Sequence, residues 1–447
     1  MRTGAALLLL LLGLLAGVSL GVRPQEDWFR TGTGIGVEKF RLAVPAFAAR
    51  STEVETVAGV FTSVLQSDLE MSGIVELVSP SFHPLEVPSQ PSELKAEAWA
   101  AAPTQAHMVA YGNLSFARNQ LLVSAWLSDV RSPQAPPALA KRYRADLSED
   151  QARQIAHQFA DEIVARLSGG VPGIAQTRIA FVSDRSGTKE IWVMDYDGFN
   201  QRQVTRCGFL CLTPRWSPDN SRLAYTAYEQ AAASSQVPRT SIQLYSMVMN
   251  RRMAFPYLGG TTTTPAWSPN GKELALSSSR TGDPEVYVAN ADGGHLRRLT
   301  YSPGVDISPA WNPRTGKQIA FVSDRGGLPQ VYLMDADGSN LQRLTNGEGY
   351  AVSPAWSPNG QMIAFAWQQG NSHFDIYAMD VATRQTVQLT RDSGRNEQPS
   401  WAPDGRHLVF QSTRSGRNQV WTMLADGTGV HQLTFEGSNT APHWSLR

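Results

Sequence analysis

The tripeptide Pro-x-Trp recurs six times in this 447-residue chain, from Pro214 onward, and its spacing limits the folds that are possible. The tryptophans follow one another at intervals of 51, 44, 45, 45 and 43 residues; they are Trp216, Trp267, Trp311, Trp356, Trp401 and Trp444. Each repeat also contains two longer β-rich runs. Five repeats end in a short run closed by Leu-Thr or Val-Thr, and Asp-Gly turns occur in four repeats. Four short strands in about 45 residues are the pattern of a β-propeller blade.

The phase of the repeats predicts how such a ring closes. The first repeat begins at Ile179 with a strand that no Pro-x-Trp precedes, and the sequence ends just after Trp444. The last segment therefore supplies the missing innermost strand of the first blade. We predict a six-bladed β-propeller over residues 171–447, closed by the C-terminal strand, with each repeated tryptophan packed between adjacent blades.

The first 36 residues predict an export signal followed by a tail. Residues 1–21 combine one basic residue with an apolar run at Ala5–Ala16, and Ser19 and Gly21 stand at the positions of a cleavage site. The run is short for a transmembrane helix, although an uncleaved anchor is the alternative. We expect an exported protein without a membrane span after cleavage. Residues 22–36 lack periodicity and predict an extended, mobile tail.

Residues 37–168 predict a small α/β domain with the order β-α-β-α-β-β-β-α. Thr52 and Glu55 form the pattern of a capping box at the start of the first helix, and Ser148 with Gln151 starts the last one. No glycine-rich phosphate loop or pair of histidines at metal-ligand spacing occurs here. Three isolated histidines are expected to be surface or core residues: His83, His107 and His157.

Charge and cysteine usage narrow the function classes. Lys plus Arg total 39 and Asp plus Glu total 39, and this neutral balance argues against nucleic-acid binding. Cys207 and Cys211 have the spacing of neither the usual zinc motif nor the usual redox motif, so a local disulfide is favoured, but the sequence leaves their pairing open. The Ser-Asp-Arg runs that begin at Ser183 and Ser323 look catalytic, yet their repetition favours a role in bracing loops.

The combination of these features resembles the TolB family of periplasmic proteins across nearly the whole mature chain. Blades with Pro-x-Trp-Ser-Pro-Asp and Ile-Ala-Phe-Val-Ser-Asp-Arg follow the α/β domain, and Leu69–Gly73, Ile155–His157 and Thr177–Phe181 are similar to the matching stretches of the family. The propeller motif alone is shared with other propellers, whereas its combination with this first domain is specific. The second blade departs from the pattern through an insertion at Tyr228–Ser241.

The resemblance implies a binding function. TolB proteins belong to the Tol-Pal envelope system, bind the lipoprotein Pal through the propeller and the inner-membrane protein TolA through the tail, and support outer-membrane integrity and cell division. We therefore expect a periplasmic, monomeric adaptor that is not an enzyme and needs no cofactor or metal. The tail residues implied in binding TolA are Val22, Arg23, Pro24, Gln25, Glu26, Asp27 and Trp28.

Propeller topology places the expected Pal site. The link before each Pro-x-Trp lies on the same face as the turns between second and third strands, so the links surround the channel mouth. The positions that match the family's Pal pocket are Leu212, Thr213, Thr261, Thr264, Ile307, Ser308, Val352, Ser353, Glu397 and Gln398, with Thr440 and Ala441 from the closing strand. An outer collar is expected from Arg185, Arg280, Arg325 and Arg414. Alternatively, these are merely solvated link residues.

Two other functions compete with docking. A propeller-containing hydrolase would need an α/β-hydrolase domain with a Gly-x-Ser-x-Gly elbow, and the sequence contains no such pentapeptide. A ligand or ion in the propeller channel is the other alternative, and the sequence leaves it open.

Overall fold

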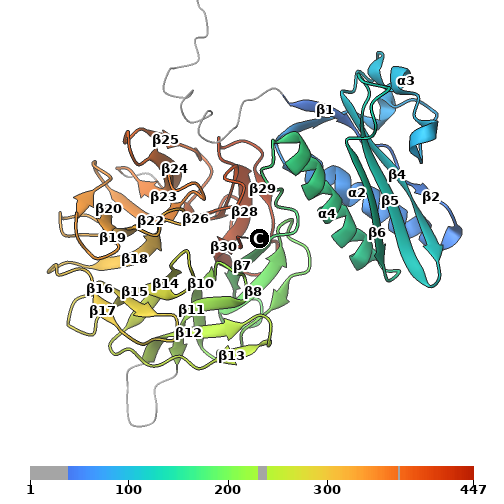
Figure 1. The fold of residues 1–447 in the computed structure, drawn as a ribbon. Coiled ribbons are helices and arrows are strands. Elements are labelled where there is room, and N and C mark those ends of the chain that lie inside the picture. The colour runs from blue at the N-terminus through green and yellow to red at the C-terminus, as the bar shows by residue number, and fades with distance from the viewer. Residues whose placement is uncertain (1–38, 230–238, 371–372, 447) are drawn as a thin grey trace, which may run out of the picture.

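The computed structural model describes residues 39–229, 239–370 and 373–446. The predicted signal peptide (1–21) and tail (22–36), including the residues assigned to TolA, lie outside the described residues. Figure 1 shows a small domain of helices and strands beside a ring of sheets. The prediction of a small N-terminal α/β domain followed by a six-bladed β-propeller is confirmed.

The N-terminal domain is built on a six-stranded mixed sheet of order β3-β1-β4-β5-β6, with β2 paired to β4. Its strands are β1 (Phe40–Ala43), β2 (Ala48–Ala49), β3 (Val75–Leu77), β4 (Met108–Ala117), β5 (Gln120–Asp129) and β6 (Leu139–Ala145). Its helices are α2 (Glu55–Met71), α3 (Ala96–Ala100) and α4 (Glu149–Leu167), with 3-10 turns at Thr52–Val54, Pro80–Phe82 and Pro91–Glu93. Helices α2 and α4 pack together, and their buried side chains share one core with the sheet.

The two long helices begin differently. Ser148 lies in extended conformation before α4, and its Oγ accepts a hydrogen bond from Gln151 N–H (3.2 Å), as the sequence predicts. The capping box predicted at Thr52 and Glu55 is wrong. Thr52 lies inside a 3-10 turn, and α2 starts only at Glu55, after Val54, with no side-chain cap. A residue inside a helical turn cannot adopt the extended conformation that a cap requires.

The propeller consists of six four-stranded antiparallel sheets. From the channel outward, blade 1 contains β30 (Asn439–Trp444), β7 (Arg178–Ser183), β8 (Glu190–Asp195) and β9 (Arg202–Gln203). Blade 2 contains, in the same direction, β10 (Leu210–Trp216), β11 (Arg222–Glu229), β12 (Arg239–Ser246) and β13 (Arg251–Met253). Blade 3 contains β14 (Thr262–Trp267), β15 (Glu273–Ser278), β16 (Glu285–Asn290) and β17 (Arg297–Arg298).

The remaining blades repeat this arrangement. Blade 4 contains β18 (Asp306–Trp311), β19 (Gln318–Ser323), β20 (Gln330–Asp335) and β21 (Gln342–Arg343). Blade 5 contains β22 (Tyr350–Trp356), β23 (Met362–Gln368), β24 (Asp375–Asp380) and β25 (Thr386–Gln388). Blade 6 contains β26 (Asn396–Trp401), β27 (His407–Ser412), β28 (Gln419–Leu424) and β29 (His431–Gln432).

The repeated tryptophans join neighbouring blades, and the last of them seals the ring. All six are buried. The indole Nε1–H of Trp356 donates to Ala310 O (3.0 Å) in the preceding blade, and those of Trp267 and Trp401 make equivalent bonds. Strand β30 pairs antiparallel with β7, so that Trp444 lies opposite Ile179. The chain therefore closes as predicted, with its last strand innermost in blade 1.

The two domains share a buried junction. Asp68 on α2 accepts hydrogen bonds from Tyr196 Oη of blade 1 (2.6 Å) and from His157 Nδ1 of α4 (2.7 Å). The His407 ring of blade 6 donates from Nε2 to Met71 O (2.7 Å) at the end of α2. One hydrophobic core runs from the N-terminal sheet into blades 1 and 6. Among the described residues, no helix is long and apolar enough to cross a membrane.

Candidate functional site at the channel mouth

One face of the propeller, which we call the mouth face, is formed by the links between blades together with the turns between second and third strands. Contacts in blade 1 show this pairing. Asp184, in the turn after β7, donates its N–H to Ser438 O (3.3 Å) in the link before β30, and Cys211 N–H donates to Lys189 O (2.8 Å). The opposite face bears the turns that contact the N-terminal domain. The links converge on the channel as the sequence predicts.

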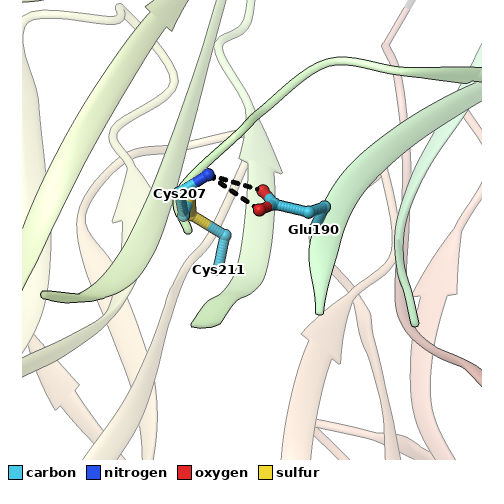
Figure 2. A group of neighbouring side chains, drawn as sticks. All are labelled: Glu190, Cys207 and Cys211. Carbon is cyan, nitrogen blue, oxygen red and sulfur yellow. Dashed lines mark hydrogen bonds between the residues drawn. A yellow bond between two sulfur atoms is a disulfide. The ribbon is translucent and has the colours of Figure 1, made fainter. Parts of the chain in front are cut away.

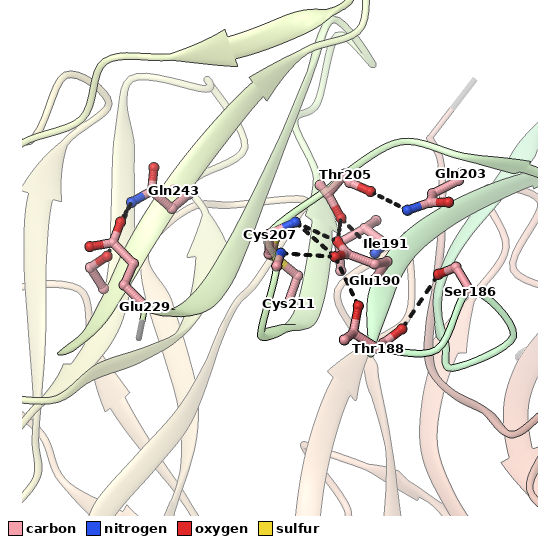
Figure 3. Close-up of a disulfide and its surroundings, with 12 residues drawn as sticks. Ser186, Thr188, Glu190, Ile191, Gln203, Thr205, Cys207, Cys211, Glu229 and Gln243 are labelled. Carbon is pink, nitrogen blue, oxygen red and sulfur yellow. Dashed lines mark hydrogen bonds between the residues drawn. A yellow bond between two sulfur atoms is a disulfide. The ribbon is translucent and has the colours of Figure 1, made fainter. Parts of the chain in front are cut away.

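In five of the six blades, a buried threonine near the end of the repeat is hydrogen-bonded to the start of the third strand. In blade 1 the Thr205 hydroxyl donates to Glu190 Oε2 (2.6 Å) and accepts from Ile191 N–H (2.8 Å), as Figure 3 shows. The same arrangement joins a threonine to the first residue of the third strand in four other blades, in the pairs Thr300–Glu285, Thr345–Gln330, Thr390–Asp375 and Thr434–Gln419. Burial raises the pKa of Glu285, although its hydrogen bonds from Thr300 and Arg298 oppose that rise.

The innermost strand of every blade contains a bulge, and we call the six residues at these bulges the mouth ring. All six have left-handed φ between 49° and 56°, and none is glycine; they are Thr213, Thr264, Ser308, Ser353, Gln398 and Ala441. The strand register shifts at each of them. A non-glycine residue in this region costs roughly 1–3 kcal/mol, and such strain is concentrated at functional sites.

Hydroxyl groups connect part of the mouth ring from blade to blade. Ser308 N–H donates to Thr264 Oγ1 (3.3 Å), and Thr264 N–H donates in turn to Thr226 Oγ1 (3.1 Å). Thr213 Oγ1 lies 2.8 Å from the same Thr226 hydroxyl. These bonds stabilise the unusual backbone of blades 2 to 4.

Five of the ten predicted Pal-site residues line one cavity of about 180 Å³ in the channel; they are Thr213, Thr264, Ser308, Ser353 and Gln398. The other five do not line that cavity. Leu212, Ile307, Val352 and Glu397 each precede a mouth-ring residue and are half-buried, and Glu397 forms an ion pair with Arg395 (2.6 Å). Thr261 is exposed in the link before β14 and donates its N–H to Ser279 Oγ (3.0 Å).

Exposed aromatic side chains occur along the links that lead to the mouth ring, and sequence reasoning missed them. We call this set the aromatic rim; its members are Phe209, Tyr257, Tyr301, Tyr350 and Phe435. Each lies in a link or directly after it, so five of the six links contribute one. Tyr301 is 75% exposed and Phe435 is 73% exposed. The sequence did contain a signal for these residues. Each is an aromatic residue in the turn-rich segment between the end of one repeat and the next Pro-x-Trp.

A disulfide holds the link that contains Phe209. Cys207 and Cys211 are bonded to each other, which answers the question that the sequence left open. Figure 2 shows the Glu190 carboxylate beside Cys207, whose N–H donates to both of its oxygens (2.7 and 2.9 Å). Gly208 N–H also donates to Glu190 (3.3 Å). Because the sulfurs are joined and the carboxylate is engaged, this group acts as a structural clamp.

Three of the four arginines of the predicted outer collar are held against their own blades by their side chains. In blade 4 the Arg325 Nε donates to Ser323 Oγ (2.8 Å), and its guanidinium forms an ion pair with Asp306 (2.6 Å). Arg185 and Arg414 make the equivalent bond to a serine two residues earlier, and both lie over a tryptophan ring. In blade 3 the backbone N–H of Arg280 donates to Ser278 Oγ (3.3 Å). The Ser-Asp-Arg runs therefore brace loops, as the sequence interpretation favoured.

Comparison with known proteins agrees with this architecture. A model of the TolB beta propeller domain matches residues 165–374 and 344–447, and a model of the TolB amino-terminal domain matches residues 33–135. The chain belongs to the TolB family. The crystal structure of TolB from Acinetobacter baumannii superposes with a TM-score of 0.77 at 25% identity, covering 91% of this chain and 97% of that one.

Sequence relatives carry the same family name. The Tol-Pal system protein TolB of Bordetella pertussis is 32% identical over 317 residues, which are 69% of this chain and 66% of the relative. The Protein TolB homolog of Chlorobium luteolum is 36% identical over 179 residues, 40% of this chain and 38% of the relative. The matched stretches thus span between about two fifths and two thirds of these relatives.

Proposed function

We propose that this protein is a periplasmic adaptor of the Tol-Pal envelope system that docks a Pal-like lipoprotein on its mouth face. The aromatic rim around the strained mouth ring is the observation on which the proposal depends. The Bordetella relative is a Tol-Pal system protein by name, and this supports the choice of system. The proposed role is binding rather than catalysis, with outer-membrane integrity and cell division as the processes served.

The chemistry of the mouth face suits a protein ligand. Contiguous exposed aromatic side chains mark interaction surfaces, and tyrosine and phenylalanine are enriched at interface centres. The mouth ring inside the rim offers small and hydroxyl-bearing side chains, such as Thr264 and Ser308, which leave room for an inserted loop and supply hydrogen bonds. The hydrogen-bonded backbone beneath them is rigid, so little ordering entropy is lost on docking.

We also propose that the tail binds a TolA-like inner-membrane protein through Val22–Trp28. These residues lie outside the described part of the chain, so this half of the proposal is supported by the family resemblance alone. The expected periplasmic location follows from the predicted signal peptide, and we propose that the adaptor acts as a monomer.

Calorimetric titration of the mature protein with the folded domain of a Pal-like lipoprotein tests the docking site. Removing the side chains of Tyr301 and Phe435 together is expected to weaken binding at least about tenfold, or ~1.4 kcal/mol, because exposed aromatics are frequent interface anchors. Phe82→Ala is the matched control, since Phe82 is a similarly exposed aromatic residue in the N-terminal domain. Equal affinity of the double variant and the unmodified protein would refute the mouth site.

A further inference from the structure

The residue between proline and tryptophan in each repeat lines the channel cavity. The polar and the apolar members of this set of six lie on different sides of the ring. Going round the ring from blade 1, they are His443, Arg215, Ala266, Ala310, Ala355 and Ser400. Three neighbouring blades thus present methyl groups, whereas the other three present donors. The described lining residues include no Asp, Glu or Lys. Arg215 is accordingly the one permanently charged group among them.

The Arg215 guanidinium lacks a counter-charge within the described part of the chain. Its one side-chain hydrogen bond runs from Nη1 to the adjacent Pro214 O (2.9 Å), and none of the described carboxylates pairs with it. Burial lowers the pKa of Arg215 to about 10, so the group remains protonated at neutral pH. A guanidinium cannot shed its charge as a buried lysine can, so this positive charge stays uncompensated by the side chains that the structure describes.

His443 adds a neutral donor beside that charge. Its Nδ1 accepts a hydrogen bond from Trp216 N–H (3.3 Å), and this places the ring hydrogen of the neutral imidazole on Nε2. Burial, together with the neighbouring Arg215 charge, holds the pKa of His443 well below its ordinary value. Ser400 completes the set, because its Oγ accepts from Trp444 N–H (3.1 Å) and its own hydrogen has no acceptor among the described residues.

We propose that the propeller channel binds one small carboxylate anion, held by the Arg215 guanidinium with donors from His443 and Ser400. The planar fork of arginine matches the two oxygens of a carboxylate. A cavity of about 180 Å³ accommodates such an anion with some water. The anion site needs no residue from a partner protein, although five residues of the mouth ring line the same cavity. Because the test below uses no partner, its outcome is separate from that of the docking test.

Acetate titration of the full mature chain, at constant ionic strength with chloride as the replaced ion, tests the site. We expect saturable heat of binding and a perturbed ¹⁵N resonance of the His443 side chain, assigned through His443→Gln. Arg215→Met retains the length of the side chain but removes its charge, and it is expected to weaken acetate binding about ten- to a hundredfold. Arg215→Lys is expected to restore part of the affinity.

The control is Arg391→Met, because Arg391 is an exposed arginine in the link between blades 5 and 6 and lies outside the cavity lining. Its affinity for acetate should equal that of the unmodified protein. Circular dichroism checks folding, and Ser400→Ala provides a milder variant if Arg215→Met does not fold; it too should weaken binding. Absence of saturable binding, equal responses to acetate and chloride, or undiminished binding by the folded cavity variant would each overturn the proposal.

Discussion

The buried carboxylate of Asp404 holds the His407 ring, and that ring bonds to the end of helix α2. Asp404 of blade 6 lies 2.7 Å from His407 Nδ1, and the other nitrogen of that ring donates to Met71 O, so both ring nitrogens face acceptors. Burial tends to raise the pKa of Asp404, but the charge and hydrogen bond of His407, assisted by Arg406, prevail and lower it to about 2. The ionised carboxylate is therefore part of the folded state.

Asp404→Asn is expected to destabilise the protein by about 2 kcal/mol at pH 7, because the folded pKa is about 2 and the ordinary value is 3.8. A lowered pKa contributes stability above pH 3.8 and loses it as the pH falls through about 2. Urea unfolding at pH 7 and at acid pH should show the difference between variant and unmodified protein shrinking over that window. A pH-independent difference would assign the effect to packing instead.

At the scale of the element, the links rather than the strands distinguish one blade from another. The strands repeat the same pairings, whereas the links vary in length and in the side chains that they expose. The link between blades 1 and 2 is the one closed by a disulfide, and Glu190 accepts from two of its backbone N–H groups. Its conformation is thus set locally, and Phe209 is exposed at its centre.

Cys207→Ser with Cys211→Ser is expected to cost about 2 kcal/mol of folding free energy, since so short a loop contributes little closure entropy. Docking of the Pal-like domain should weaken at the same time, because Phe209 loses its fixed position. Thermal unfolding and calorimetric titration measure the two effects separately. Phe209→Ala with the disulfide intact should reproduce the loss of binding without the loss of stability, and a double-serine variant that binds normally would contradict this role.

At the scale of the whole molecule, Trp444 takes part both in closing the ring and in the junction between the two domains. The Trp444 Nε1–H donates to Thr177 Oγ1 (2.7 Å), and its ring belongs to the core that extends into the N-terminal domain. Trp311 is equally part of the repeat and is buried, but its Nε1–H has no hydrogen-bond partner among the described residues. The two tryptophans therefore have the same packing role and different polar roles.

Trp444→Phe is expected to lower the free energy of unfolding by about 1 kcal/mol more than Trp311→Phe does. Both variants lose similar packing, but only Trp444→Phe removes the hydrogen bond that the Thr177 hydroxyl accepts. Urea unfolding of the two variants gives the comparison directly, and Trp311→Phe serves as the matched control. Equal costs would show that the bond to Thr177 contributes nothing net to closing the ring.

The repeated spacing and its phase, by themselves, determined the number of blades and the manner of closure, because a strand pattern repeated about every 45 residues buries its faces in few ways. The fold class and the position of the mouth links followed. The sequence predicted local turns less well: α2 starts at Glu55, after a 3-10 turn, and not at a cap formed by Thr52. A 3-10 turn and a capping box differ by subtle backbone angles that residue types alone do not specify.

Only the tertiary structure decided which link residues act together. Thr264 and Ser308 line the cavity, whereas the adjacent Ile307 does not, because a bulge reverses the local register. The aromatic rim brings together residues separated by up to 226 positions, from Phe209 to Phe435. Likewise Arg215 and His443 become neighbours only when the ring closes. Sequence repeats specify each blade, whereas side chains from different blades meet through the geometry of the closed ring.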